Sequence, residues 1–248
     1  MPRSPAAPPA APPATVATRA RAPAGRRLAY DRAERIADAA VHWTGLALAL
    51  MSVPALVLLA AFLDGRGEVV AGIGLYGAAL LAMLGASAAY NMIQASEAWE
   101  EALRRIDHAC IYLKIAATQT PFALLMGPGQ AGWVLGSVWA AALGGATGKL
   151  FFPRLLRRIG LPLYLALGWA GLALLWPGEG ARPLAGPTLI LAMAGGVLYT
   201  VGVGFFLAER LRFHNAIWHG FVLIASLSFY AALTTELGLR AAAAEAGS

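Results

Sequence analysis

Seven apolar stretches of about 20 residues follow one another along the chain and constrain its fold more than any other feature. They lie at approximately 38–62, 69–92, 107–126, 131–151, 160–176, 187–207 and 215–236, and glycine, proline and charge clusters separate them. A helix of about 20 apolar residues crosses a bilayer. Only 13% of the residues are charged, against roughly 25% in soluble domains. The sequence therefore predicts an all-α integral membrane protein, a bundle of seven transmembrane helices.

Short breaks and terminal segments set the expected organisation around these spans. The break "GPGQ" at Gly127–Gln130 is too short for anything but an antiparallel hairpin. Residues 1–30 are rich in Pro, Ala and Arg and contain no acidic residue, which predicts a disordered cytoplasmic tail rather than a secretory signal. We expect the membrane domain at 31–240 and a short C-terminal tail at 241–248.

Basic residues on alternate connections predict the orientation of the bundle. Most of them precede the first span or follow the second, fourth and sixth, and the opposite side has only Arg66, Arg182 and Arg240. By the positive-inside rule the N-terminus is cytoplasmic. The net charge of +6 thus reflects topology and attraction to anionic membrane lipids, and no nucleic-acid partner is expected.

Polar residues gather at the predicted cytoplasmic ends of the spans. Ser87 and Asn91 are four residues apart, as are Asn215 and His219, so each pair shares one helical face. Polar groups inside a membrane normally face one another or a wet cavity. We therefore expect one polar cluster just inside the cytoplasmic leaflet, composed of His42, Ser87, Asn91, Asp107, Asn215 and His219.

Six segments of the chain form a recognisable series: "ERIADAAVHWTG" from Glu34, "SAAYN" ending at Asn91, "LRRIDHACIYLKIAATQTPF" from Leu103, "LYLALGW" from Leu163, "GGVLYTVGVGFF" from Gly195 and "HNAIWHGFVL" from His214. In this order and spacing they resemble the bacterial hemolysin III proteins, relatives of the progestin and adiponectin receptors (PAQR-like). The resemblance implies a seven-helix fold with a cytoplasmic N-terminus. It also implies the bacterial inner membrane as the location.

The resemblance implies a zinc site as well. In that family Ser-x-x-x-His on helix two and His-x-x-x-His on helix seven supply three zinc ligands, and an Asp of helix three binds through water. Relatives resemble zinc-dependent ceramidases, in which Ser87 and Asp107 would correspond to catalytic groups. This chain keeps Ser87, Asp107 and His219 but has Asn91 and Asn215 at the two other ligand positions.

The two asparagines predict that zinc is not held tightly. An amide oxygen is a hard, weak donor that suits zinc poorly. His214 is next to Asn215 but about 100° away around the helix, so it cannot take over that position. His42 and His108 are the other histidines that could be recruited.

Lys114 is a second departure, because it lies where the family pattern has an apolar residue. It is two turns beyond Asp107 on roughly the same face, and a lysine inside a span marks function by default. One hypothesis makes its ammonium a substitute for the zinc charge, neutralising Asp107. The alternative is ordinary snorkelling to the interface.

Three functions are compatible with these features. The favoured hypothesis is a non-catalytic, metal-degenerate relative in membrane-lipid homeostasis or sensing, which could bind a lipid-like ligand. The alternative is a zinc-dependent hydrolase of a lipid amide or ester, and the third is pore-forming or cytolytic activity. No amphipathic soluble segment that could insert into a membrane supports the third. The sequence does not specify an oligomeric state.

Overall fold

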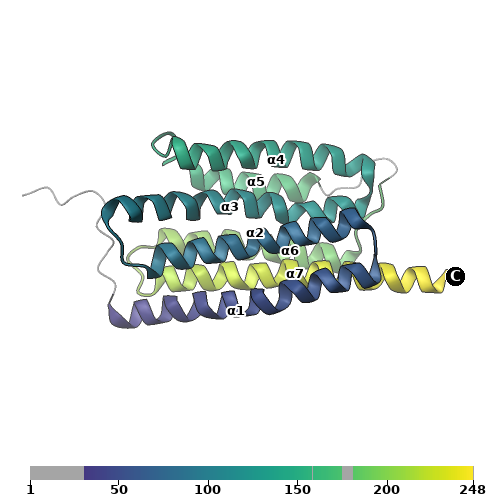
Figure 1. Cartoon of the computed structure of the whole chain (residues 1–248), viewed down its shortest axis with the longest axis horizontal. Helices are drawn as coiled ribbons and strands as arrows, with labels where there is room; N and C mark the ends of the chain where they lie inside the picture. Colours follow the sequence, from purple (N-terminus) through teal and green to yellow (C-terminus); the bar gives the residue numbers. More distant parts are fainter. Residues whose placement is uncertain (1–30, 158, 175–180, 248) are drawn as a thin grey trace, which may run out of the picture.

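A computed structural model describes residues 31–157, 159–174 and 181–247. Seven α-helices lie side by side along the long axis of the molecule (Figure 1), and no strand occurs among the described residues. Their bounds are α1 Arg32–Leu63, α2 Gly67–Met92, α3 Glu97–Met126, α4 Pro128–Phe151, α5 Gly160–Leu174, α6 Gly186–Leu207 and α7 His214–Ala246, with a short 3₁₀ turn at Leu155–Arg157. The all-α bundle that the sequence predicts is confirmed for the described residues.

Local sequence signals explain several helix ends. α1 begins in a capping box, in which the Asp31 carboxylate accepts from Glu34 N and the Glu34 carboxylate accepts from Asp31 N. Between α3 and α4 the chain turns at Gly127 alone, whose φ of 112° favours glycine, and Pro128 opens α4. The expected antiparallel hairpin is therefore present.

Six of the helices are long and apolar enough to cross a membrane. α5 is the shorter one, with 15 residues or about 22 Å. Its connection to α6 nevertheless returns to the far end of the bundle, where Arg182 N donates to Met126 O at 2.9 Å. The chain is thus a multi-pass membrane protein, and α5 is too short to be counted among the six candidate spans.

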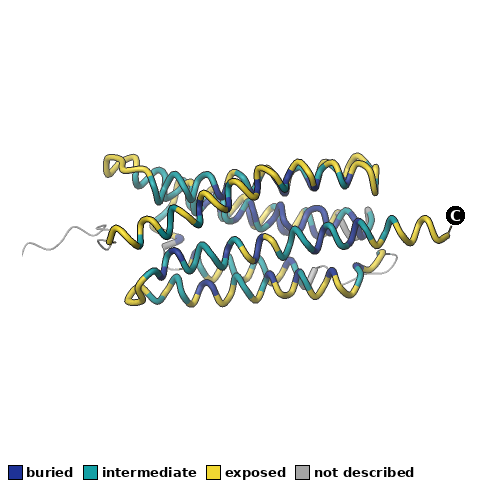
Figure 2. Tube along the Cα trace, turned by 90° about the horizontal axis from the view of Figure 1, so that it is seen from below, coloured by how far each residue is buried: buried dark blue, intermediate teal, exposed yellow. Residues whose placement is uncertain are grey.

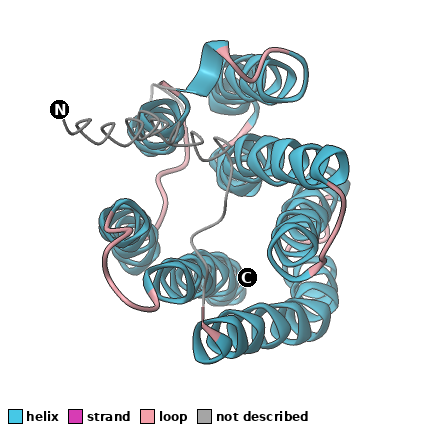
Figure 3. Ribbon diagram, turned by 90° about the vertical axis from the view of Figure 1, so that its left-hand side faces the viewer, coloured by secondary structure: helices cyan, strands magenta, loops and turns pink. Residues whose placement is uncertain are grey.

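α3 is the central helix of the bundle. In its most apolar 18-residue window 72% of the residues are buried, against 44% or less in the other long helices. One apolar cluster joins α3 to α1, α2 and α7, and a second joins it to α4 and α5. Buried positions accordingly concentrate inside the bundle while its outer faces are exposed (Figure 2), and Figure 3 shows the helices end-on around this interior.

α3 and α7 extend furthest beyond the spans that the hydropathy pattern predicts. α3 begins at Glu97, ten residues before the expected span, so its first turns are polar and helical. α7 continues to Ala246, and the C-terminal tail expected from residue 241 is instead mostly its last turns. The apolar pattern marks only the part of a helix that lies in the apolar layer of the membrane or in the core. It therefore does not predict the polar extensions of α3 and α7. The tail expected at 1–30 lies outside the described residues.

Candidate functional site at the end where α1 begins

The polar residues of the sequence come from four helices and meet at one end of the bundle. We call it the site end, the end at which α1, α3 and α7 begin and α2 finishes (Figure 1, left). His42 lies on α1, Ser87 and Asn91 on α2, Asp107 on α3, and Asn215 and His219 on α7.

A hydrogen bond and an ion pair join α1 to the α6–α7 connection and position the start of α7. Glu34 accepts a hydrogen bond from Phe213 N at 3.1 Å, and Arg212 pairs with Asp31 at 2.9 Å. Phe213 itself adopts a left-handed conformation with φ of 63°. The backbone hydrogen bond from Glu34 and the Arg212 guanidinium hold the pKa of Asp31 below its usual value. These contacts fix the register of α7 against α1, and with it the positions of the histidines.

Asp38 orients two imidazoles that lie edge to face, with ring centroids 4.3 Å apart. His42 Nδ1 is 2.8 Å from the backbone oxygen of Asp38, and His219 Nδ1 is 2.7 Å from Asp38 Oδ1. Both partners only accept, so each Nδ1 carries a hydrogen. The Nε2 atoms of both rings are consequently the ones with free lone pairs.

Those two lone pairs converge on the hydroxyl of Ser87. Its Oγ lies 3.2 Å from His42 Nε2 and 3.4 Å from His219 Nε2, and the Asp107 carboxylate lies close enough to interact with both Ser87 and His219. A serine hydroxyl has a single hydrogen to donate. Two imidazole nitrogens therefore compete for one hydrogen, with the Asp107 carboxylate nearby, and this excess of acceptors favours a cation at the site, either a proton or a metal ion.

The asparagines at the ligand-equivalent positions are hydrogen-bonded within the same cluster. Asn215 Nδ2 donates to Asn91 Oδ1 and to Asp38 Oδ2, each at 3.3 Å. Asn91 Nδ2 in turn donates to the Ser87 backbone oxygen at 2.9 Å. The two amides thus connect α2 and α7, and the Asn215 amide also holds the Asp38 carboxylate that orients His219.

Asp38 is the residue that the sequence interpretation missed. One ligand atom each from Asp38, His42 and His219 lies within 4.8 Å of the others, the one such group in the described part of the chain. The signal was present, because Asp38 and His42 are four residues apart, the same spacing that drew attention to the pairs on α2 and α7. Of the two histidines considered for recruitment, His42 occupies the cluster and His108 is not in this group. His214 is buried at the start of α7 and does not belong to the group either.

Lys114 does not pair with Asp107. Its side chain is 3% exposed and its ammonium donates to Tyr199 Oη, 4.6 Å from the centre of the Tyr199 ring and 5.4 Å from that of Phe229. Tyr199 Oη is 2.8 Å from Ser226 Oγ. No described ion pair joins the lysine to a carboxylate, so the structure supports neither charge substitution at Asp107 nor snorkelling. The side chain points to α6 and α7 because aromatic faces there accept a cation.

Comparison with known proteins identifies the family. The model of the family described as Haemolysin-III related matches residues 34–230. The chain belongs to the haemolysin III family. The match runs from the first turn of α1 into α7 and includes every residue of the cluster.

Two relatives cover most of the haemolysin III fold. Hemolysin-3 of Bacillus cereus is 36% identical over 200 residues, which are 79% of this chain and 89% of that protein. A Hemolysin-3 homolog of Bacillus subtilis (strain 168) is 35% identical over 202 residues, 79% of this chain and 91% of that protein. The family resemblance inferred from the sequence motifs is thereby confirmed.

Proposed function

We propose that this haemolysin III protein is a metal-dependent hydrolase of a lipid amide or ester in the bacterial inner membrane, with a zinc ligand set that has moved toward α1. The observation that carries the proposal is the convergence of His42 Nε2 and His219 Nε2 on one point beside the Asp107 carboxylate. The sequence had favoured a metal-degenerate, non-catalytic relative because two expected histidines are asparagines. The position of His42 weakens that objection.

The residues present fit a zinc ion. His42 and His219 would hold it through Nε2, and Asp107 would supply negative charge beside them. Zinc-binding histidines usually donate their other ring N–H to a carboxylate or a backbone carbonyl, which fixes the ring and its tautomer. Asp38 provides both kinds of partner, one to each ring. The site therefore has orienting groups as well as ligands.

Each side chain of the site has a separate task in such a hydrolysis. A bound zinc ion lowers the pKa of a water ligand to about 7 and polarises a carbonyl. Asp107 would accept a proton at a carboxylate oxygen, since it lies close enough to interact with Ser87 and His219. Ser87 Oγ would donate its one hydrogen to the carbonyl oxygen of the substrate. Asn215, which also donates to Asn91, would hold Asp38 and through it His219 in place.

Hydrolysis by the purified protein tests the proposal. Full-length protein in detergent, supplied with zinc, should release fatty acid from a short-chain ceramide or a lysophospholipid. His42→Asn and His219→Asn should each abolish release, whereas Asp64→Asn at the opposite end of the bundle should not. Asp38→Asn should lower zinc affinity by about 10–100-fold, the usual effect of removing an orienting partner. Release that survives both histidine changes would exclude the proposal.

A second candidate function is sensing or lipid homeostasis without catalysis, and one observation favours it. The hydrogen bond between Asn91 and Asn215 closes the two positions at which the family pattern places zinc ligands. A protein of this kind would bind a lipid-like ligand and hold a proton rather than a metal at the histidine pair. Zinc-independent ligand binding, unaffected by His42→Asn, would favour this candidate over the hydrolase.

The printed names of the relatives suggest cytolysis as a further candidate. Release of haemoglobin from erythrocytes by the purified protein would support it. We expect no release, because the six long apolar helices are typical of permanent membrane spans.

A further inference from the structure

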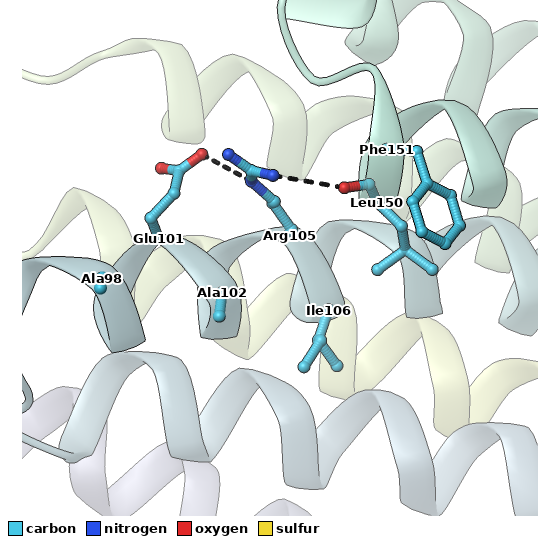
Figure 4. Close-up of a pocket in the computed structure, with 7 residues that line it drawn as sticks. All are labelled: Ala98, Glu101, Ala102, Arg105, Ile106, Leu150 and Phe151. Atoms are coloured by element: carbon cyan, nitrogen blue, oxygen red, sulfur yellow. Dashed lines mark hydrogen bonds and ion pairs between the residues drawn. The ribbon is translucent and has the colours of Figure 1, made fainter.

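We infer that a groove between α3 and α4 at the site end binds an anionic phospholipid. Ala98, Glu101, Ala102, Arg105 and Ile106 of α3 form one side, and Leu150 and Phe151 of α4 form the other (Figure 4). The hollow has a volume of about 510 Å³. Its lining combines apolar side chains with a guanidinium, as an amphipathic ligand would require.

The groove is separate from the histidine cluster. Arg105 and Asp107 are two residues apart on α3, which places them about 200° apart around the helix. The residues of α3 that line the groove recur at helical spacing on the Arg105 side. A ligand in the groove would therefore contact the face of α3 turned away from Ser87 and His219, and the inference does not depend on the proposed hydrolase.

Arg105 is held across the groove by contacts to both helices. Its Nε donates to Glu101 Oε1 at 2.8 Å, and its Nη1 donates to the backbone oxygen of Leu150 at 3.4 Å (Figure 4). A guanidinium has five N–H groups, so three remain for a further acceptor. Guanidinium groups match phosphate geometry well and can bind it with two parallel hydrogen bonds.

A second hollow of about 430 Å³ continues the groove beyond the end of α4. Arg105 and Phe151 line both hollows, and Arg154 lines the second. Phe151 is 70% exposed and Leu155 72% exposed, so large apolar side chains surround the two cations. An acyl chain would lie against the apolar side chains and a phosphate against the guanidiniums.

Charge selects an anionic lipid over a zwitterionic one. Among the charged residues that line the two hollows, Arg105 and Arg154 are positive and Glu101 is negative. Glu101 is already shared between Arg104 and Arg105. The excess positive charge favours a headgroup with a net negative charge, such as phosphatidylglycerol, and basic pockets of this kind between membrane helices are known to bind anionic headgroups.

Lipid binding by the full-length protein in detergent tests the inference. Mixed micelles containing phosphatidylglycerol or phosphatidylcholine are titrated into the protein, and the lipid bound per protein is measured by native mass spectrometry. We expect preferential binding of phosphatidylglycerol. Arg105→Gln and Arg154→Gln should each weaken it about tenfold, because a hydrogen bond to a charged group is worth roughly that factor.

Matched controls distinguish lipid binding in the groove from a general attraction of anionic lipid to a basic protein. Arg35 is an exposed arginine on α1 at the same end, so Arg35→Gln should leave binding unchanged. Glycerol phosphate, which has the headgroup without acyl chains, should compete weakly. Equal binding of the two lipids, equal losses in Arg35→Gln and Arg105→Gln, or full competition by glycerol phosphate would each overturn the inference.

Discussion

At the scale of single residues, the candidate site combines two losses with two replacements. Asn91 and Asn215 cannot serve as strong zinc ligands, but they are hydrogen-bonded to each other, and Asn215 also donates to the Asp38 carboxylate. Asp38 and His42 then supply an oriented imidazole from α1. On the proposed function, the imidazole of His42 would take the place of a ligand that the asparagines do not supply, and the site end would still hold a cation.

The interaction partner of Lys114 can be identified from the coupling between mutations. Because its ammonium contacts Tyr199, Lys114→Leu and Tyr199→Phe should be coupled by about 0.5–3 kcal/mol in a double-mutant cycle. Lys114→Leu and Asp107→Asn should instead be additive within about 0.5 kcal/mol. Thermal unfolding in detergent gives both cycles. Coupling to Asp107 without coupling to Tyr199 would restore the charge-substitution hypothesis.

At the scale of elements, close packing between α6 and α7 holds α7, the helix that carries His219, in place. A Cβ added to Gly202 would lie 2.7 Å from Phe221 Cβ, and one added to Gly195 would lie 2.7 Å from the Phe229 ring. Small residues in membrane helices allow this kind of approach. Gly204 differs, since a Cβ there would meet nothing within 4 Å.

This difference gives a paired prediction for α6. Gly202→Ala should cost about 1–3 kcal/mol of stability, because the added methyl must displace α7. Gly204→Ala should change stability by no more than about 0.5 kcal/mol. Thermal unfolding of the two variants in the same detergent makes the comparison, and equal losses would show that α6 and α7 are not packed as described.

Comparison of the predicted and observed helices shows how much of the fold and of the site the sequence predicts. Hydropathy located all seven helices, since each presents an apolar surface that lipid or core requires. It placed the start of α3 at Asp107 instead of Glu97, because a helix that extends out of the apolar layer to the level of the lipid headgroups no longer needs a continuous run of apolar residues. The four-residue spacing of Ser87 and Asn91, and of Asn215 and His219, predicted that these side chains share one cluster. It could not reveal that Asp38 faces His219, since that contact depends on how α1 packs against α7.

At the scale of the whole molecule, the order of the helices and the charges of their connections predict a topology. A reporter active only outside the cytoplasm should be silent when fused after Pro153, between α4 and α5. It should be active when fused after Arg182 or after Gly247, if α5 crosses the membrane and the N-terminus is cytoplasmic. Activity after Pro153 would invert the orientation, and silence after Arg182 would show that α5 does not cross.

The central claim is that His42 and His219 hold a metal ion, and metal content tests it most directly. The full-length protein, purified gently in detergent without added zinc, is analysed elementally beside His42→Asn and the control Asp64→Asn. We predict about one zinc ion per chain in the natural protein and in Asp64→Asn, and a large loss in His42→Asn, since His219 alone is too few ligands. Natural protein without metal, or His42→Asn with undiminished zinc, would contradict the account.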